Sequence, residues 1–260
     1  MTGGLHIALA AERLGSVFGI PITNSLVTAW VVMALLIVAA YFIGRSTKMT
    51  PGKAQSAFEL LFEFVLDYME QTLGTRALAE RFFPLIATIF LFIFTANMLD
   101  YFPLIGSLGF TRGAEFVPLF RPVNTDLNVT LALAIIVFLT IEISGILALG
   151  VLKYGSKFVN FKTGAMGLVV GLLEIIGNLA RLVSFSFRLF GNIFAGEVLI
   201  AVISSFLPYL LPVPLMLFET FVGLLQAAIF ALLTLVFIKL AIMEPHGNGQ
   251  AHGEEAHVQH

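Results

Sequence analysis

The chain has 260 residues, of which 58% are hydrophobic and 12% are charged, and its formal net charge is -2. A soluble domain has roughly 45–50% apolar and about 25% charged residues, so this chain has too few polar side chains to cover a water-exposed surface. These figures exclude a soluble globular protein and predict one whose solvent is lipid. The weak charge gives no basic field for nucleic acid, and without Cys the chain has no disulfide or thiolate metal site.

Five apolar stretches are candidates for crossing about 30 Å of hydrocarbon, which needs about 20 helical residues. We expect them at about residues 26–44, 84–98, 127–150, 166–207 and 215–243. Residues 1–25 lack a short apolar core behind a basic start, so we expect an outer segment there and no cleaved signal peptide. The sequence therefore predicts an all-α integral membrane protein with one membrane domain over residues 1–260.

Residues 57–73 differ from these stretches because apolar and acidic side chains alternate at helical spacing. The apolar positions are Phe58, Leu61, Phe62, Val65, Leu66 and Met69, and the acidic ones are Glu59, Glu63, Asp67 and Glu70. Such a pattern is typical of an amphipathic helix that lies in the membrane plane or against the bundle. A surface helix of a small soluble insert is the alternative, but no second amphipathic segment is available to pack against it.

The distribution of Lys and Arg predicts the orientation. One side of the expected membrane holds Arg45, Lys48, Lys53, Arg76, Arg81, Lys153, Lys157 and Lys162, and the other holds Arg13, Arg112 and Arg121. We therefore expect the amino terminus outside and the carboxyl terminus inside. Residues 245–260 are polar and Gly-rich, which predicts a disordered inner tail. Its four histidines have no fixed geometry, so we expect no metal site and no cofactor.

The stretch 166–207 is too long for one perpendicular crossing. As a single helix it would be about 60 Å long at 1.5 Å per residue, so it must be steeply tilted or broken within the membrane. Pro208, Pro212 and Pro214 then turn the chain into the last apolar stretch. We expect residues 166–243 to form a tilted helical hairpin.

This hairpin contains polar and charged residues, which are expensive at membrane depth and therefore indicate function. At about 100° per residue, five of them fall on one stripe: Glu174, Asn178, Arg181, Arg188 and Asn192. Glu197 lies about 180° from Arg188, so it faces a different neighbour. In the last stretch Glu219 and Gln226 share a face, which would allow Glu219 to lie beside Glu197.

Structural salt bridges are the alternative explanation for these charges, and Glu174 and Arg181, seven residues apart, could form such a pair. Arg188 fits that explanation less well, because its neighbours four residues away, Ser184 and Asn192, are uncharged. An acid from another chain would be a suitable partner for Arg188.

The segment SFSFRLFGNIFAGE, residues 184–197, resembles the signature of subunit a (subunit 6 in mitochondria) of the membrane sector of F-type ATP synthases. ELLFEFV (59–65), FTANMLDYFP (94–103), PVNTDLNVTLALA (122–134) and LLQAAIFALLTLVF (224–237) are similar to further segments of that family in the same order. The resemblance covers nearly the whole chain except its two ends.

The resemblance implies a non-catalytic stator subunit with two aqueous half-channels, set against a rotating ring of c subunits that each carry one membrane carboxylate. It implies that Arg188 is the essential arginine and that Asn192, Glu197, Gln226 and Glu174 belong to the proton path. Glu219 stands where bacterial relatives have His and mitochondrial ones Glu, so this chain has acids at both positions of a paired channel site. Candidate channel-lining residues are Asn97, Asp100, Asp126, Asn128, Asn178 and Arg181.

The implied partners are the c-ring, peripheral-stalk b-type subunits, other ATP synthase subunits and membrane lipid, in a bacterial or mitochondrial inner membrane. The choice between protons and sodium ions depends largely on the ring subunit. Two other functions remain open at this point: an ion-coupled secondary transporter, which often shows internal repeats, and a structural subunit whose charges merely pair. We see no such repeat here, and the charges concentrate in one hairpin.

Overall fold

The structure is a computed structural model that describes residues 11–17, 19–48, 52–101, 108–112, 115–158, 165–207 and 210–243. Within these ranges the chain forms α1 (Asn24–Ser46), α2 (Lys53–Leu73), α3 (Arg76–Leu99), α4 (Leu127–Leu149), α5 (Val151–Phe158), α6 (Ala165–Phe206) and α7 (Pro212–Ile242). Five of these helices, α1, α3, α4, α6 and α7, are long and apolar enough to cross a membrane. The expected class, an all-α membrane protein with about five crossings, is confirmed.

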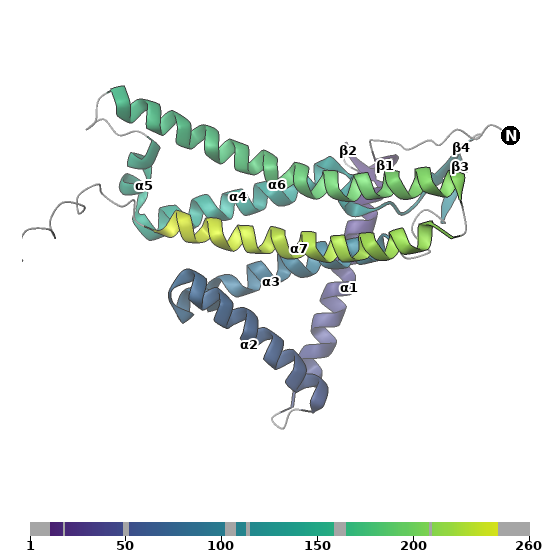
Figure 1. The fold of residues 1–260 in the computed structure, drawn as a ribbon, viewed down its shortest axis with the longest axis horizontal. Helices are drawn as coiled ribbons and strands as arrows, with labels where there is room; N and C mark the ends of the chain where they lie inside the picture. Colours follow the sequence, from purple (N-terminus) through teal and green to yellow (C-terminus); the bar gives the residue numbers. More distant parts are fainter. Residues whose placement is uncertain are drawn as a thin grey trace, which may run out of the picture.

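The helices α6 and α7 run side by side along the longest axis of the molecule, and α1 crosses them steeply (Figure 1). The 42 residues of α6 form one continuous helix, although glycines lower helix propensity. Both α6 and α7 pack against α4, and α7 also packs against α3. The two polar-rich helices therefore have neighbours that can hold their side chains in place.

The third helix begins earlier than the sequence predicts. Its first residue is Arg76, whereas the expected stretch began at Pro84. Thr75 caps the helix, because its Oγ1 accepts a hydrogen bond from the backbone N–H of Leu78 at 3.4 Å. Pro84 lies inside the helix, where it removes only one backbone donor. The prediction was wrong here because the first turns of α3 are polar and do not resemble a membrane span.

The sequence also gave no indication of the short elements. Strands β1 (Arg13–Val17) and β2 (Ile20–Thr23) form one antiparallel hairpin, and β3 (Gly109–Arg112) and β4 (Glu115–Pro118) form another. Both hairpins lie toward the end of the molecule where α6 leads into α7 (Figure 1). A 3-10 turn, η1 (Val123–Thr125), precedes α4. Segments this short have no hydrophobic period long enough to predict them.

The amphipathic helix α2 extends from Lys53 to Leu73, four residues longer than expected at its start. Met69 and Leu73 are buried in the core near its carboxyl end. On its acidic side, Arg76 of α3 forms ion pairs with Glu63 at 3.2 Å and Asp67 at 2.7 Å. Acidic residues of the expected polar face of α2 therefore form ion pairs with one arginine just after the α2–α3 turn.

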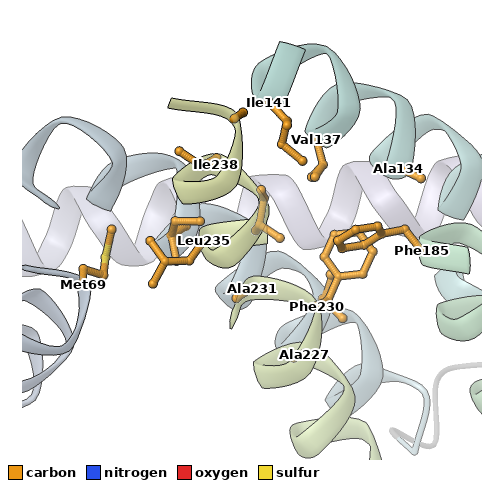
Figure 2. Close-up of a cluster of buried hydrophobic side chains, with 14 of the residues drawn as sticks. Met69, Ala134, Val137, Ile141, Phe185, Ala227, Phe230, Ala231, Leu235 and Ile238 are labelled. Atoms are coloured by element: carbon orange, nitrogen blue, oxygen red, sulfur yellow. The ribbon is translucent and has the colours of Figure 1, made fainter. Parts of the chain in front are cut away.

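The main core joins α2, α3, α4, α6 and α7 (Figure 2). At its centre the rings of Phe185 of α6 and Phe230 of α7 meet edge to face, with centroids 4.8 Å apart. Many large apolar side chains outside this core are exposed, as lipid-facing residues are. The core fixes the mutual register of α4, α6 and α7, and so the positions of the polar residues that those helices carry.

Candidate functional site

Arg188 lies on the exposed surface of α6, two turns before the end of the predicted signature. Its Nη2 donates a hydrogen bond to Ser184 Oγ at 3.2 Å, one turn earlier on the same helix. Among the residues that the structure describes, every ion pair involves Arg76, so no carboxylate of the described chain pairs with Arg188. The preceding residue, Phe187, is an exposed apolar side chain. The guanidinium is therefore open to a partner outside this chain.

The predicted polar stripe on α6 follows the edge of the buried helix face. Asn178 is buried, Glu174, Arg181 and Asn192 are half-buried, and Arg188 is exposed. The residues that face the core are displaced from this stripe around the helix, at Phe185, Leu189 and Ile193 among others. The stripe therefore borders both the bundle and the outer surface of the helix.

In the part of α6 toward the α6–α7 turn, Glu219 of α7 packs against Gly196. A Cβ at Gly196 would overlap the Glu219 carboxylate, so this carboxylate lies against the α6 backbone at the residue before Glu197. In the part of the chain that the structure describes, Glu197 Oε2 and Glu219 Oε2 are both buried without a hydrogen-bond partner. Each of the two helices thus carries an acid with a buried oxygen that could accept a proton or bind water, and both acids act electrostatically on Tyr101.

Asp100 joins this group from the end of α3. Burial raises the pKa of the Asp100 carboxyl well above its ordinary value, and the nearby charge of Glu197 raises it further. Neither oxygen of Asp100 has a hydrogen-bond partner among the described residues. Burial likewise raises the pKa of Tyr101, with smaller contributions from Glu219, Asp100 and Glu197. We call Asp100, Glu197 and Glu219, which all act electrostatically on Tyr101, the outer acid cluster, after the side on which the distribution of basic residues predicts it.

Asn97 and Gln226 lie on neighbouring helices further along the bundle. Asn97 Nδ2 donates to the backbone carbonyl of Gly223 at 2.9 Å, and Asn97 Oδ1 accepts from Asn124 Nδ2 at 2.6 Å. Gln226 is buried, and within the described residues its Nε2 has no hydrogen-bond partner. Asn97 therefore ties α3 to α7 and η1, while Gln226 retains a free donor.

Asp126 and Asn128 have a local role in the structure. Asp126 is the N-cap of α4, and its Oδ1 accepts hydrogen bonds from the backbone N–H and the Nδ2 of Asn128, each at 3.0 Å. Its Oδ2 accepts from the hydroxyl of Ser25 in α1. Both carboxylate oxygens are thus occupied by capping and by the contact between α1 and α4.

Arg121 is a residue that the sequence analysis did not select. It is buried before η1, its Nε donates to Thr125 Oγ1 at 3.4 Å, and it lies within electrostatic range of Glu197. Arg121 lies in a loop, so no helical or strand periodicity could mark it as a site residue. Its place directly before the PVNTD run was the one available indication in the sequence. It supplies positive charge next to the outer acid cluster.

A second polar group lies nearer the amino-terminal end of α6, between α4, α5 and α6. Glu142 of α4 accepts hydrogen bonds from Tyr154 Oη at 2.9 Å and from Asn178 Nδ2 at 3.1 Å. Arg181 Nη1 donates to Asn178 Oδ1 at 2.8 Å. We call Glu142, Tyr154, Asn178 and Arg181 the inner polar cluster, again after the predicted orientation.

Glu142 was missed by the sequence analysis, and a signal for it was available. It is the one ionisable residue in the otherwise apolar residues 127–149. A single acid in a membrane span is costly and by that reasoning alone a candidate for function. Its two hydrogen-bond donors come from α5 and α6, which no pattern within α4 could have indicated.

The two clusters lie on either side of Arg188 along α6. Glu197 is nine residues after Arg188, about 13 Å along the helix, and Asn178 is ten residues before it, about 15 Å. No group of three His, Asp or Glu side chains that could hold a metal ion occurs in the described ranges. The predicted tail with its four histidines lies outside them.

A family model described as ATP synthase A chain matches residues 26–239. The chain belongs to the ATP synthase subunit a family. Subunit a of Moorella thermoacetica is 32% identical over 219 residues, covering 84% of this chain and 90% of the relative. Subunit a of Campylobacter jejuni is 33% identical over 220 residues, covering 84% and 89%. A relative from Propionigenium modestum, named as sodium ion specific, is 30% identical over 244 residues, covering 90% and 78%.

Membership of the subunit a family, together with five candidate membrane helices, makes this chain a multi-pass membrane subunit of ATP synthase. Its partners are other subunits of that complex. Of the functions that the sequence left open, the ATP synthase role is the one that the relatives support.

Proposed function

We propose that this chain is the stator channel subunit that couples proton flow to rotation of the c-ring, with Arg188 as the essential charge. The observation that carries the proposal is the exposure of Arg188 on α6, with Ser184 as its hydrogen-bond partner and no ion pair to the described chain. A guanidinium left open in this way suits a carboxylate that another chain presents.

The chemistry of proton exchange with a rotor requires an arginine. A ring carboxyl must be neutral to pass through lipid, because an unpaired ion in a low dielectric is expensive. A fixed guanidinium favours the charged carboxylate and so releases its proton. Arginine keeps its own proton under working conditions, whereas lysine can lose it. The positive charge also opposes direct proton flow past Arg188.

On the outer side, protons would move through the outer acid cluster. Glu197 and Glu219 are the relay groups, because each has a buried oxygen available for a proton or water. Asp100, Gln226 and Asn97 would line this route, and Asn192 lies one turn from Arg188 on the way to Glu197. Asp126 and Asn128 act as the cap of α4 rather than as proton carriers.

On the inner side, Glu174, Asn178 and Arg181 would line the second route, which begins about 15 Å before Arg188 along α6. Arg181 lies over the ring of Phe237 in α7, with 5.0 Å from its Cζ to the ring centroid. A membrane potential supplies about 2.3 kcal/mol per charge per 100 mV, which would set the direction of flow between the two routes.

The orientation follows from the distribution of basic residues. Arg45 and Lys48 end α1, and Lys153 lies in α5, so these ends would face the inside, with the amino terminus outside. The exposed apolar surface would face lipid, the c-ring and the b-type stalk subunits of a bacterial or mitochondrial inner membrane. The subunit would form no covalent bond itself, so its role is non-catalytic.

The test uses the whole ATP synthase reconstituted in vesicles. Arg188→Ala should abolish ATP-driven proton pumping while the complex still assembles, and Arg188→Lys should restore little of it. Arg45→Ala is the matched control, because Arg45 is an exposed arginine at the end of α1 that stacks on Tyr41. Normal pumping by assembled Arg188→Ala complexes would refute the proposal.

The same vesicles identify the transported ion. Pumping that depends on sodium and resists a protonophore would mean that this chain conducts sodium ions in place of protons.

A further inference from the structure

We infer that Glu142 is the acid that carries protons on the inner side of the membrane, with Tyr154 as the residue that positions it. This inference rests on the function proposed above. It assigns the inner-side relay to a carboxylate on α4, whereas the family motifs pointed to α6 alone.

Glu142 lies inside the membrane span formed by α4. It is seven residues, about 10 Å, from the end of α4 at Leu149. It is half-buried, and its carboxylate faces α6, where Asn178 Nδ2 donates to Oε1 at 3.1 Å. No described Lys or Arg forms an ion pair with it. The two donors that hold this carboxylate, Tyr154 Oη and Asn178 Nδ2, are both neutral.

Glu142 also lines a small cleft between α4 and α6. The lining of this cleft further includes Asn178, Arg181, Ala134 and Phe185. Phe185 is three residues, about 4.5 Å along α6, from Arg188. The cleft has room for about one water molecule, and Glu142, Asn178 and Arg181 offer the polar partners that such a water needs.

The register of α4 and α6 supports this path. The two helices run antiparallel, with Thr130 Oγ1 and Ser186 Oγ 3.2 Å apart near Arg188 and Glu142 bonded to Asn178 further inward. The polar contacts between α4 and α6 thus begin level with Arg188 and end at Glu142. A proton that leaves the Arg188 region inward therefore meets Glu142 as the first acid on α4.

The proton step needs no other reactant. A rotor carboxyl that reaches Arg188 releases its proton to water, and a carboxylate oxygen of Glu142 accepts it from that water. Glu142 then passes the proton to water on the inner side and becomes a carboxylate again. One O–H bond forms for each that breaks, and no group is oxidised or reduced. When ATP hydrolysis drives pumping, the same proton transfers occur in the opposite order.

Tyr154 acts through Glu142 and is a positioning residue. Its ring packs against Gly145, where an added Cβ would overlap it, so the ring has a fixed place on α4. From there its hydroxyl donates to Glu142 Oε2 at 2.9 Å. Burial raises the pKa of the Tyr154 hydroxyl, and its hydrogen bond to Glu142 raises it further, so it remains a donor.

Among the described residues, titratable and charged groups near Glu142 lie on α5 and α6. Tyr154 comes from α5, and Arg181 and Glu174, which act electrostatically on Tyr154, come from α6. From α7, Phe237 lies against Arg181. Glu174 is the competing inner-side acid, but no hydrogen bond connects it to Glu142 among those described.

The experiment measures proton flow through reconstituted complexes stripped of their catalytic sector, as a function of pH on the inner side. Glu142→Gln keeps an oxygen that can accept from Tyr154 and Asn178 but cannot carry a proton. We expect flow to fall by about tenfold or more, which is the scale of an acid–base contribution, and Glu142→Asp to retain most of it. Glu59→Gln, an exposed inner-side carboxylate on α2, is the matched control.

If Glu142→Gln conducts as fast as the parent, with the same dependence on inner-side pH, the inference is wrong. Should that variant fail to assemble, Tyr154→Phe decides, because it keeps the ring against Gly145 and removes only the hydroxyl. We expect its flow to depend differently on inner-side pH, and an unchanged profile would overturn the inference. Arg188→Ala, measured in parallel, separates the two proposals. If Arg188→Ala abolishes coupled pumping while Glu142→Gln conducts like the parent, only the role of Glu142 is refuted.

Discussion

The carboxylate of Glu219 on α7 occupies the space that a side chain at position 196 on α6 would fill. This contact depends on the absence of a Cβ at Gly196, the residue before Glu197 in the chain. The position of the Glu219 carboxylate across the helical hairpin thus depends on one glycine, and an added methyl group at that position would disturb it.

Gly196→Ala should therefore displace the Glu219 carboxylate. We expect ATP-driven pumping to fall by about tenfold or more, because small misplacements of reacting groups are costly. Gly44→Ala in α1 is the control, since a Cβ there meets nothing within 4 Å. Pumping in reconstituted vesicles checks the effect, and an unchanged rate would mean that the position of Glu219 is unimportant.

Glu219→Gln tests the relay itself. The amide fills the same space against Gly196 but cannot pass a proton on, so we expect pumping to slow by about tenfold. The membrane should not become leaky, because Arg188 still separates the two routes. Passive proton leak and ATP-driven pumping are measured on the same vesicles. If Glu219→Gln pumps as fast as the parent protein at every pH tested, Glu219 is not part of the proton path.

Asn97→Ala should destabilise the bundle. The change leaves the Gly223 carbonyl and the Asn124 amide without their partner, and each unsatisfied buried group costs about 1–3 kcal/mol. Thermal unfolding in detergent measures the loss of stability. Thr72→Ala removes an exposed hydroxyl from α2 and should have little effect. Equal stability of the two variants would contradict the role of Asn97 as a tie between helices.

Asp100 makes stability depend on pH. Because burial raises its pKa in the folded protein, Asp100 favours folding below the ordinary aspartate pKa of about 4. That contribution is lost as the pH rises through the raised pKa. We therefore expect the unfolding temperature of the parent in detergent to fall more steeply above about pH 4 than that of Asp100→Asn. Parallel curves for the two proteins would show that Asp100 titrates normally.

Much of the fold could be predicted from the sequence, because lipid imposes a length and a composition on every crossing helix. The start of α3 could not, since its polar first turns look like a loop until Thr75 caps them. The two β-hairpins were also missed, because four or five residues carry no usable period.

The candidate site divides in the same way. Arg188, Glu197 and Glu219 could be selected from sequence because charges in apolar segments are rare. Arg121 and Glu142 were not, since their relevance depends on neighbours from other elements: Glu197 for Arg121, and Tyr154 and Asn178 for Glu142. Asp126 was selected as a channel candidate, but the hydrogen bonds that occupy both its oxygens are visible only in the structure.

By itself, the sequence determined that this chain is a membrane protein and which segments are able to cross the membrane. It also determined which polar residues lie in those segments at a free-energy cost that indicates a function. Transfer of side chains to lipid is a local property, so composition along the chain is enough to decide it. Which of those residues meet was decided by the packing of α3, α4, α6 and α7. Contacts such as that of Glu219 with Gly196, or of Glu142 with Asn178, join positions whose separation along the chain says nothing about their distance in space.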